Sequence, residues 1–219
     1  ALYGLRVKNV KKADGGFNIG FESGTAIKAD KAILSMGGAS FKATGSAGDG
    51  FRVAKGLGHT VVKLKAALVP LKTKEPWVKE VQGLSLENVR VTFECGKKRI
   101  SSEVGDIIFT HFGVSGPLVL DLSAKVVSFF EWDQKVRLFI DLKPGLKPEE
   151  LENRLLREFS RKGNPQLKNV MKSLLPNRLI GVFIGLAGLD PEKKPSQVTH
   201  AERRSIVTLL KAFPLTVIG

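Results

Sequence analysis

The chain has 219 residues, enough for one large domain or two small ones, and its 42% hydrophobic and 26% charged residues are ordinary for a globular protein. The single cysteine, Cys95, excludes an internal disulfide framework, and no His, Cys, Asp or Glu cluster has metal-ligand spacing, so we expect no bound metal. No apolar run approaches the roughly 20 residues of a membrane span, and no signal peptide opens the chain. We therefore expect a cytoplasmic protein that does not contact a membrane.

The net charge of +14 is concentrated in two parts of the sequence. Residues 1–65 carry 11 basic and 4 acidic side chains, residues 66–145 carry 11 and 10, and residues 146–219 carry 13 and 7. Such an excess attracts polyanions or an anionic cofactor or substrate. Aromatic and basic residues do not interleave and no nucleic-acid-binding motif occurs, so the pattern does not favour nucleic acid as the partner.

The first third of the chain predicts a β-meander followed by one helix. Residues 5–10 and 17–21 alternate between polar and apolar, and residues 25–28 give a third short strand. Residues 32–35 begin with a continuous apolar run, which predicts a strand buried on both faces. Phe51, Ala54 and Leu57 then have helical spacing, and the glycines at 56 and 58 are stop signals.

The middle third is predicted to be mostly β structure. We expect strands at 59–64, 68–71, 86–95, 98–104, 106–110 and 135–142, with a hairpin turn at Gly96-Lys97. Pro117 occupies a typical first helical position, and the apolar residues after it predict a short helix.

The last third is predicted to be helical. Pro148 is followed by two acids, and Leu151, Leu155 and Phe159 give a buried stripe. Further helices are expected at 166–174, 176–186 and after the capping box of Thr199 and Glu202, and residues 215–219 have the pattern of a strand. The predicted fold is α+β: a meander and a mixed, barrel-like β region, then a small helical subdomain. The predicted domains are 1–58, 59–147 and 148–213, with 214–219 starting a returning strand.

Residues 35–51 are the most informative stretch, with the sequence Ser-Met-Gly-Gly-Ala-Ser-Phe-Lys-Ala-Thr-Gly-Ser-Ala-Gly-Asp-Gly-Phe. A glycine-rich loop between a strand and a helix can bring bare backbone N–H groups close to a phosphate. Asp49 falls at the helix start, where a carboxylate favours the dipole or caps N–H groups. The alternative is a tight connection whose glycines only make turns. The loop matches neither the Walker A nor the Gly-x-Gly-x-x-Gly pattern.

A second motif, Phe-Thr-His-Phe-Gly-Val-Ser-Gly-Pro, occupies residues 109–117. His111 lies at a predicted strand end beside a helix start, where it could donate or accept a proton. Ser115 could cap the helix or donate to an anionic group. The alternative is a capped helix with a structural histidine that is hydrogen-bonded to backbone.

Three motifs in order resemble the bacterial FAD-dependent oxidoreductases described as uncharacterised flavoproteins, aminoacetone-oxidase-like or bile-acid-dehydro-reductase-like. Residues 35–51 resemble that family's Ala-Thr-Gly-Gly-x-Ser-Tyr-Pro-x-x-Gly-Ser-Thr-Gly-Asp-Gly-Tyr run. Residues 66–71 resemble its Pro-Ala-Leu-Val-Pro-Leu segment, and residues 109–117 its Phe-Thr-His-Phe-Gly-Ile-Ser-Gly-Pro segment. Two departures, Ser35-Met36 for Ala-Thr and Phe41-Lys42 for Tyr-Pro, remove a threonine hydroxyl and add a charge.

The resemblance implies that the chain is the middle of a two-domain α/β flavoprotein, without the amino-terminal dinucleotide-binding motif or the later flavin-contacting segment. It implies that FAD is contacted by loop residues Gly37, Gly38, Ser40, Thr44, Gly45, Gly48, Asp49 and Gly50. His111 and Ser115 would be the catalytic candidates on the substrate side. The expected partners are a small-molecule substrate and the rest of the FAD-binding domain.

The sequence thus predicts a fragment of an oxidoreductase that transfers a hydride between a small organic substrate and flavin. We expect the isolated chain to bind FAD weakly or not at all and to be inactive by itself. Two alternatives are a basic module that binds nucleic acid or another polyanion, and a structural insert that mediates a homodimer.

Overall fold

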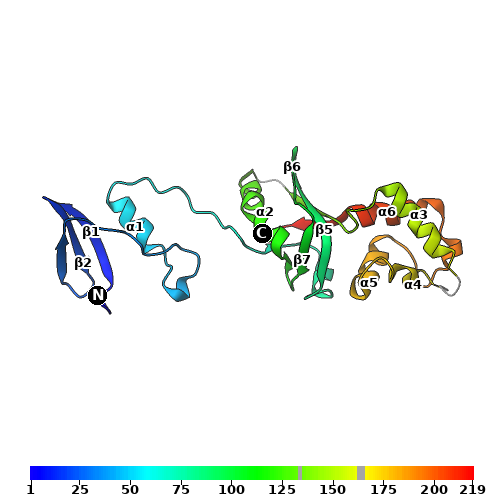
Figure 1. Cartoon of the computed structure of the whole chain (residues 1–219), viewed down its shortest axis with the longest axis horizontal. Helices are drawn as coiled ribbons and strands as arrows, with labels where there is room; N and C mark the ends of the chain where they lie inside the picture. Colours follow the sequence, from blue (N-terminus) through cyan, green and yellow to red (C-terminus); the bar gives the residue numbers. More distant parts are fainter. Residues whose placement is uncertain (133–134, 162–165) are drawn as a thin grey trace. The chain divides into compact units, whose positions relative to one another are not determined.

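A computed structural model of the chain describes residues 1–132, 135–161 and 166–219. These residues form two compact units, Ala1–Leu64 and Lys65–Gly219 (Figure 1). Both units contain antiparallel sheets and helices, so the predicted α+β class is confirmed. The predicted domain divisions after residues 58, 147 and 213 stay predictions. No helix among the described residues combines the length and the hydropathy that crossing a membrane requires.

The first unit is built on the predicted β-meander. Strands β1 (Val7–Ala13), β2 (Gly16–Phe21) and β3 (Ala26–Ala29) pair antiparallel in that order. Helix α1 (Asp49–Gly56) contacts β1, and its buried Val53 joins Val10 and Phe21 as the buried apolar side chains of this unit. The helix ends as predicted, because Leu57 caps it and Gly58 adopts a left-handed φ of 93°.

Two strand predictions in this unit are wrong. Residues 32–35 and 59–64 have no strand structure, and Ile33 and Val62 are 92% and 79% exposed. An apolar run becomes a strand only where a neighbouring strand satisfies its backbone groups, and no strand among the described residues pairs with either run. The run Ala32-Ile33-Leu34 is therefore an exposed apolar segment in this chain.

The second unit contains an antiparallel sheet whose two ends meet. Its strands follow the order β10-β9-β5-β7-β8-β4, with β6 paired to β5. Residues 72–74 exchange backbone hydrogen bonds with residues 216–219, and Thr73 lies opposite Val217. The sheet is barrel-like, as predicted. The strands are β4 (Leu71–Lys72), β5 (Ser85–Cys95), β6 (Lys98–Ser101), β7 (Gly105–Phe109), β8 (Gly113–Ser115), β9 (Val136–Asp141) and β10 (Phe213–Val217).

Local signals located most of these strands. Strands β5 and β6 form the hairpin predicted at Gly96-Lys97, with Cys95 opposite Lys98. The predicted strand at 68–71 contributes only its last residue to β4, and Leu68 has a left-handed φ of 54°, outside the extended region that regular strand residues adopt. Strand β8 lies within a stretch that the sequence analysis interpreted as a loop before a helix.

Helix α2 (Pro117–Phe129) begins at Pro117 as predicted and packs against β5, β7 and β8. An aromatic cluster lies beside this packing. The Trp77 ring meets the rings of Phe109 and Phe213 edge-on, with centroids 5.8 Å and 5.4 Å apart. Phe109 belongs to β7 and Phe213 to β10, so this cluster holds together strands from different parts of the sheet.

The helices after β9 lie together on one side of the sheet (Figure 1). They are α3 (Pro148–Phe159), α4 (Leu167–Met171), α5 (Asn177–Leu186) and α6 (His200–Lys211). The capping box predicted for α6 is confirmed, because the Glu202 N–H donates to Thr199 Oγ1 at 3.2 Å and the Thr199 N–H donates to Glu202 Oε2 at 2.8 Å. Helix α6 packs on α3, and β10 follows it after a single residue.

Strands β4 and β8 approach so closely that Gly113 has no room for a side chain. A Cβ at this position would lie 2.1 Å from the Leu71 carbonyl oxygen. We expect Gly113→Ala to lower the free energy of unfolding by about 2–3 kcal/mol, because backbone must move to relieve the overlap. Urea unfolding measures this. Gly145→Ala is the matched control, since a Cβ there meets nothing within 4 Å; equal stability of both variants would contradict the assignment.

Candidate functional site

The glycine-rich loop at residues 35–51 is an exposed connection that runs into the first turn of α1. Gly37, Gly45 and Gly48 have φ values of 73°, 91° and 87°, in the left-handed region that favours glycine. The Gly48 N–H donates to the Gly38 carbonyl oxygen at 3.0 Å, which folds the loop back on itself. Part of the glycine content therefore sets the shape of the loop, as the turn interpretation expects.

Two other glycines of the loop are not required by backbone conformation. A Cβ added at Gly38 would meet nothing within 4 Å, and one at Gly50 would lie an ordinary 3.5 Å from the Met36 Cβ. Ser40 and Thr44 are exposed, and the Thr44 hydroxyl donates to the Phe41 carbonyl oxygen at 3.1 Å within the loop. The backbone around Gly38 thus borders open space that a ligand could enter.

Asp49 is the first residue of α1, where its charge favours the helix dipole as predicted. The capping alternative is wrong, because Gly48 is the N-cap and no side chain caps the helix. The Asp49 carboxylate instead accepts hydrogen bonds from Arg52 Nη2 at 3.2 Å and from Arg6 Nη2 at 3.3 Å. These bonds, that from Arg52 first, lower the pKa of the Asp49 carboxyl. Asp49 therefore links α1 to the chain that enters β1.

The interaction of Asp49 with its two arginines predicts that the stability of the folded state depends on pH. A carboxyl whose pKa is lowered by folding stabilises the folded state above its ordinary pKa, and the contribution is lost as pH falls through the lowered pKa. We expect acidification to destabilise the wild type more than Asp49→Asn, as measured by thermal unfolding at neutral and acidic pH. Glu22→Gln is the control, because Glu22 faces Arg6 at 3.6 Å in an exposed pair. A constant difference between wild type and Asp49→Asn at every pH would contradict the linkage.

The second motif, residues 109–117, forms a hairpin that leads into α2. In this hairpin β7 pairs with β8, and Ile108 lies opposite Ser115. His111 occupies the exposed tip, where its ring meets the Phe112 ring edge-on at 4.8 Å between centroids. The Thr110 N–H donates to the Gly113 carbonyl oxygen at 2.8 Å and closes the turn.

The two predicted catalytic residues occupy different positions in this hairpin. His111 precedes β8 at the exposed tip, and Ser115 is the last residue of β8, opposite Ile108. The interpretation of Ser115 as a helix cap is wrong, because Gly116 is the N-cap of α2 and has a φ of 97°. The catalytic roles of His111 and Ser115 stay predictions.

The described residues offer neither a metal cluster nor an accessible thiol. Within residues 1–132, 135–161 and 166–219, no group of three or more His, Cys, Asp or Glu side chains is placed to hold a metal ion. Cys95 is buried at the end of β5 with 2% of its surface exposed, which supports its interpretation as a packing residue.

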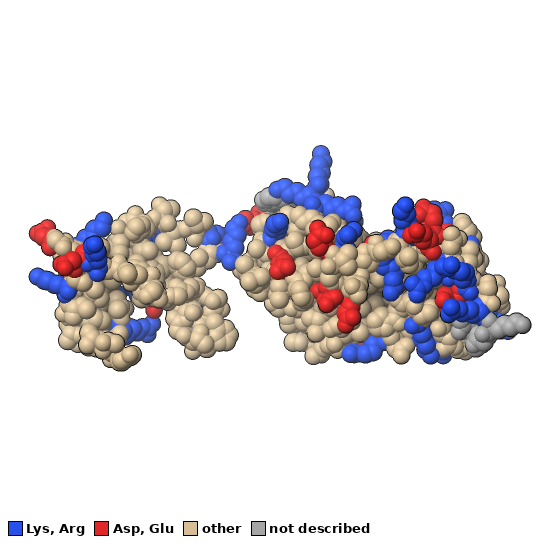
Figure 2. Space-filling model, viewed as in Figure 1, with Lys and Arg blue, Asp and Glu red and all other residues tan. Residues whose placement is uncertain are grey.

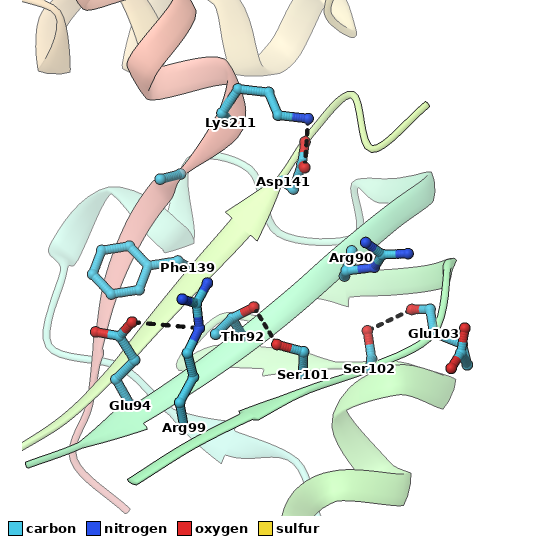
Figure 3. A pocket seen from close by; sticks show the side chains of 11 residues that line it. Arg90, Thr92, Glu94, Arg99, Ser101, Ser102, Glu103, Phe139, Asp141 and Lys211 are labelled. Atoms are coloured by element: carbon cyan, nitrogen blue, oxygen red, sulfur yellow. Dashed lines mark hydrogen bonds and ion pairs between the residues drawn. The ribbon is translucent and has the colours of Figure 1, made fainter. Parts of the chain in front are cut away.

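The sequence analysis missed a polar groove of about 530 Å³ that lies over β5, β6 and β9 (Figure 3). Its centre is the hydroxyl pair Thr92–Ser101, 2.9 Å apart. At one end Asp141 meets Lys211 at 2.7 Å, and at the other Glu94 lies 3.7 Å from Arg99. The only sequence signal for the groove is the two-residue spacing of polar side chains along β5, since cross-strand pairing brings in the others.

The charges of this groove largely satisfy one another. Glu94 also pairs with Arg137 at 3.2 Å, so one carboxylate serves two arginines. Arg90 has no ion pair among the described residues, although Asp141 lies opposite it on β9. A ligand that binds in the groove would have to displace these ion pairs. The arrangement of the side chains does not point to a particular chemical reaction.

Comparison with known proteins gives a family match over the second unit. Residues 65–219 match the family described as HI0933-like protein barrel and H2TH domain. This range includes the barrel-like sheet and helices α2–α6. The first unit, with its glycine-rich loop, lies outside the matched range.

Curated relatives match nearly the whole chain. The 3-dehydro-bile acid delta(4,6)-reductase of Clostridium scindens is 23% identical over 214 residues, covering 98% of this chain and 52% of the relative. The ribosomal RNA dihydrouridine synthase of Escherichia coli is 27% identical, covering 93% of this chain and 48% of the relative. The protein of the same name from Haemophilus influenzae is 28% identical, with 85% and 43% covered. The chain therefore spans about half the length of the curated relatives that it matches.

Proposed function

The chain belongs to the family described as HI0933-like protein barrel and H2TH domain, and from this membership we propose that it is part of a flavin-dependent oxidoreductase. FAD is the proposed cofactor and a small organic molecule the proposed substrate. The resemblance of the three motifs to FAD-dependent oxidoreductases supports this proposal, as does the similarity to a reductase. When bound, the flavin supplies the hydride chemistry, and the protein binds and orients the reactants.

The open backbone beside the start of α1 carries the proposal. Residues 37–38 and 48–50 bring glycines to a helix start at which the N–H groups of Asp49 and Gly50 have no intrahelical acceptor. Because Gly38 borders open space, a cofactor could approach its backbone without steric conflict. These features fit a bound FAD, which Gly37, Gly38, Ser40, Thr44, Gly45, Gly48 and Gly50 would contact. Asp49 would act indirectly, by fixing α1 through its two arginines.

We propose that the flavin site is completed by polypeptide beyond this chain. The run Ala32-Ile33-Leu34 has the composition of a buried strand, yet Ile33 is 92% exposed here. Covering such a run with neighbouring strands would bury its apolar side chains and satisfy its backbone groups. The coverage of about half of each curated relative is consistent with this division.

The hairpin at 109–117 is the proposed substrate side. Because His111 is exposed at the tip and Ser115 lies at the other end of β8, we assign them separate tasks. His111 would exchange a proton with substrate, and Ser115 would hydrogen-bond an anionic group near the start of α2.

Gly38→Ala tests the cofactor site, because it is a structurally neutral change unless a ligand approaches the loop. In a protein that joins this chain to the polypeptide proposed to complete the flavin site, we expect the variant to fold normally and to lose at least about tenfold in FAD affinity, or about 1.4 kcal/mol. Flavin fluorescence titration measures the affinity. Gly56→Ala is the control, since a Cβ at the end of α1 also meets nothing within 4 Å.

Two results would count against the flavin proposal. One is unchanged flavin affinity in Gly38→Ala, which would exclude close approach of the cofactor to this loop. The other is a longer natural protein that retains no flavin at all. For the 219-residue chain alone we expect little flavin to co-purify; a stoichiometric amount would overturn the proposal that further polypeptide completes the site.

RNA is a second candidate for the substrate of the proposed flavin-dependent reaction, in place of a small organic molecule. Two relatives bear the name ribosomal RNA dihydrouridine synthase, and the chain has a net charge of +14. Figure 2 shows lysines and arginines gathered over the helices of the second unit on the visible face. Exposed cations of these helices and their connections that have no ion pair among the described residues include Arg157, Lys172, Lys194 and Arg204.

Salt-dependent binding distinguishes RNA from a small substrate. If RNA binds, replacing these four cations by alanine should reduce the slope of log affinity against log salt by about 0.7 for each phosphate that is no longer neutralised. The same number of replacements on the meander, at Lys8, Lys11, Lys12 and Lys28, is the matched control. Equal effects of the two sets, or no RNA binding by the wild type, would exclude an RNA interface on the helices.

A further inference from the structure

A cleft of about 330 Å³ lies in the second unit, between the sheet and the segments that flank its helices. Three segments line it: residues 85–89 of β5, residues 142–143 after β9, and residues 174–176 between α4 and α5. Its apolar lining includes the buried side chains of Leu86, Val89, Leu142, Leu174 and Leu175. The volume lies at the lower end of the range for small-molecule sites, about 300–1,000 Å³.

An irregularity in β5 forms one wall of the cleft. The pairing of β5 with β7 shifts register between Leu86 and Val89. Within this bulge Asn88 has a left-handed φ of 55°, and its N–H donates to Asp106 Oδ1 at 3.2 Å instead of continuing the ladder. Bulges and strained residues of this kind are concentrated at binding sites, where they redirect a strand locally.

Lys143 also lines the cleft, and hydrogen bonds fix its backbone. Its N–H donates to Asp141 Oδ1 at 2.9 Å, and its carbonyl oxygen accepts from Lys211 Nζ at 3.0 Å. The other oxygen of Asp141 pairs with Lys211 at 2.7 Å. The Asp141 carboxylate is thus already engaged. Within the part of the chain that the structure describes, the Lys143 ammonium has neither a hydrogen bond nor an ion pair.

The surroundings of Lys143 make this cleft cationic. The side chain is half-buried, and burial first and the nearby Arg154 second lower the pKa of its ammonium. Arg154 donates to the Ser173 carbonyl oxygen at 3.2 Å, next to the segment that closes the cleft. The lining residues include one carboxylate, Glu87, which is exposed. A half-buried ammonium without a counter-charge is destabilised, and an anion in the cleft would relieve this.

We propose that this cleft binds a small organic anion, whose carboxylate or phosphate group pairs with Lys143 and whose apolar body lies on the leucines of β5 and of the segment before α5. The same cleft brings together the cation of Lys143 and apolar residues from β5 and from the segment before α5. Neither contact involves the glycine-rich loop or the hairpin at 109–117. The proposal therefore stands independently of flavin binding.

Calorimetry of the whole chain with three probes tests the proposal. Octanoate and octyl phosphate carry the two candidate head groups on one apolar body, and 1-octanol is the neutral control. We expect at least one of the two anions to bind about tenfold more tightly than octanol, because a hydrogen bond to a charged group adds to the apolar contact. Whichever anion binds more tightly identifies the head group.

Three variants separate the ion pair from other effects. Lys143→Met keeps most of the length of the side chain without its charge and should abolish the preference for the anion over octanol. Lys143→Arg keeps a cation and should retain that preference. Lys79→Met removes one exposed lysine elsewhere in the same unit and should change nothing.

The proposal is overturned if the wild type binds octanol as tightly as both anions, or binds none of the probes. It is also overturned if Lys143→Met keeps the preference for the anion. Should Lys143→Met fail to fold, as judged by circular dichroism, Lys143→Arg decides: loss of the preference in that folded variant would contradict the role of the cation.

Discussion

The pairing of residues next to β4 with residues of β10 joins the two edges of the sheet, and the arrangement of the second unit depends on it. Backbone hydrogen bonds between residues 72–74 and 216–219 place β10 beside the extension of β4. Strands β9 and β10 are also paired with each other. Helices α3–α6 lie between these two strands in the sequence, so the sheet fixes both the start and the end of the helical segment. Residues 142–143, which follow β9, and the bulge of β5 both line the cleft. The sheet also fixes β8, and with it the hairpin that bears His111.

Helix starts and turns could be predicted from sequence where a few neighbouring residues determine them. Pro117, the capping box of Thr199 and Glu202, and the Gly96-Lys97 turn all gave correct positions. Prediction failed where a strand depends on its partner. Ala32-Ile33-Leu34 has the composition of a buried strand but pairs with no strand among the described residues, and the three residues of β8 form a strand only because β4 and β7 flank them.

The candidate sites show the same division. The glycines of the 35–51 loop could be recognised from sequence, but the role of Asp49 could not, since Arg6 lies 43 positions away. His111 and Ser115 are close in sequence, but only the structure shows that one lies at the hairpin tip and the other ends β8. Lys143 carried no sequence signal. Its ammonium becomes distinctive only after folding, when it is half-buried and the neighbouring Asp141 is paired with Lys211.

The joined sheet also determines when the second unit can fold during synthesis. Strands β4 and β10 are separated by nearly the whole length of the unit, so their pairing is among its most non-local contacts. Such pairing carries a large loop-closure entropy and slows folding. The ribosome must release residues 213–219 before the sheet can be completed. Until then the apolar face that β10 covers stays open to solvent, and to any chaperone that binds nascent chains.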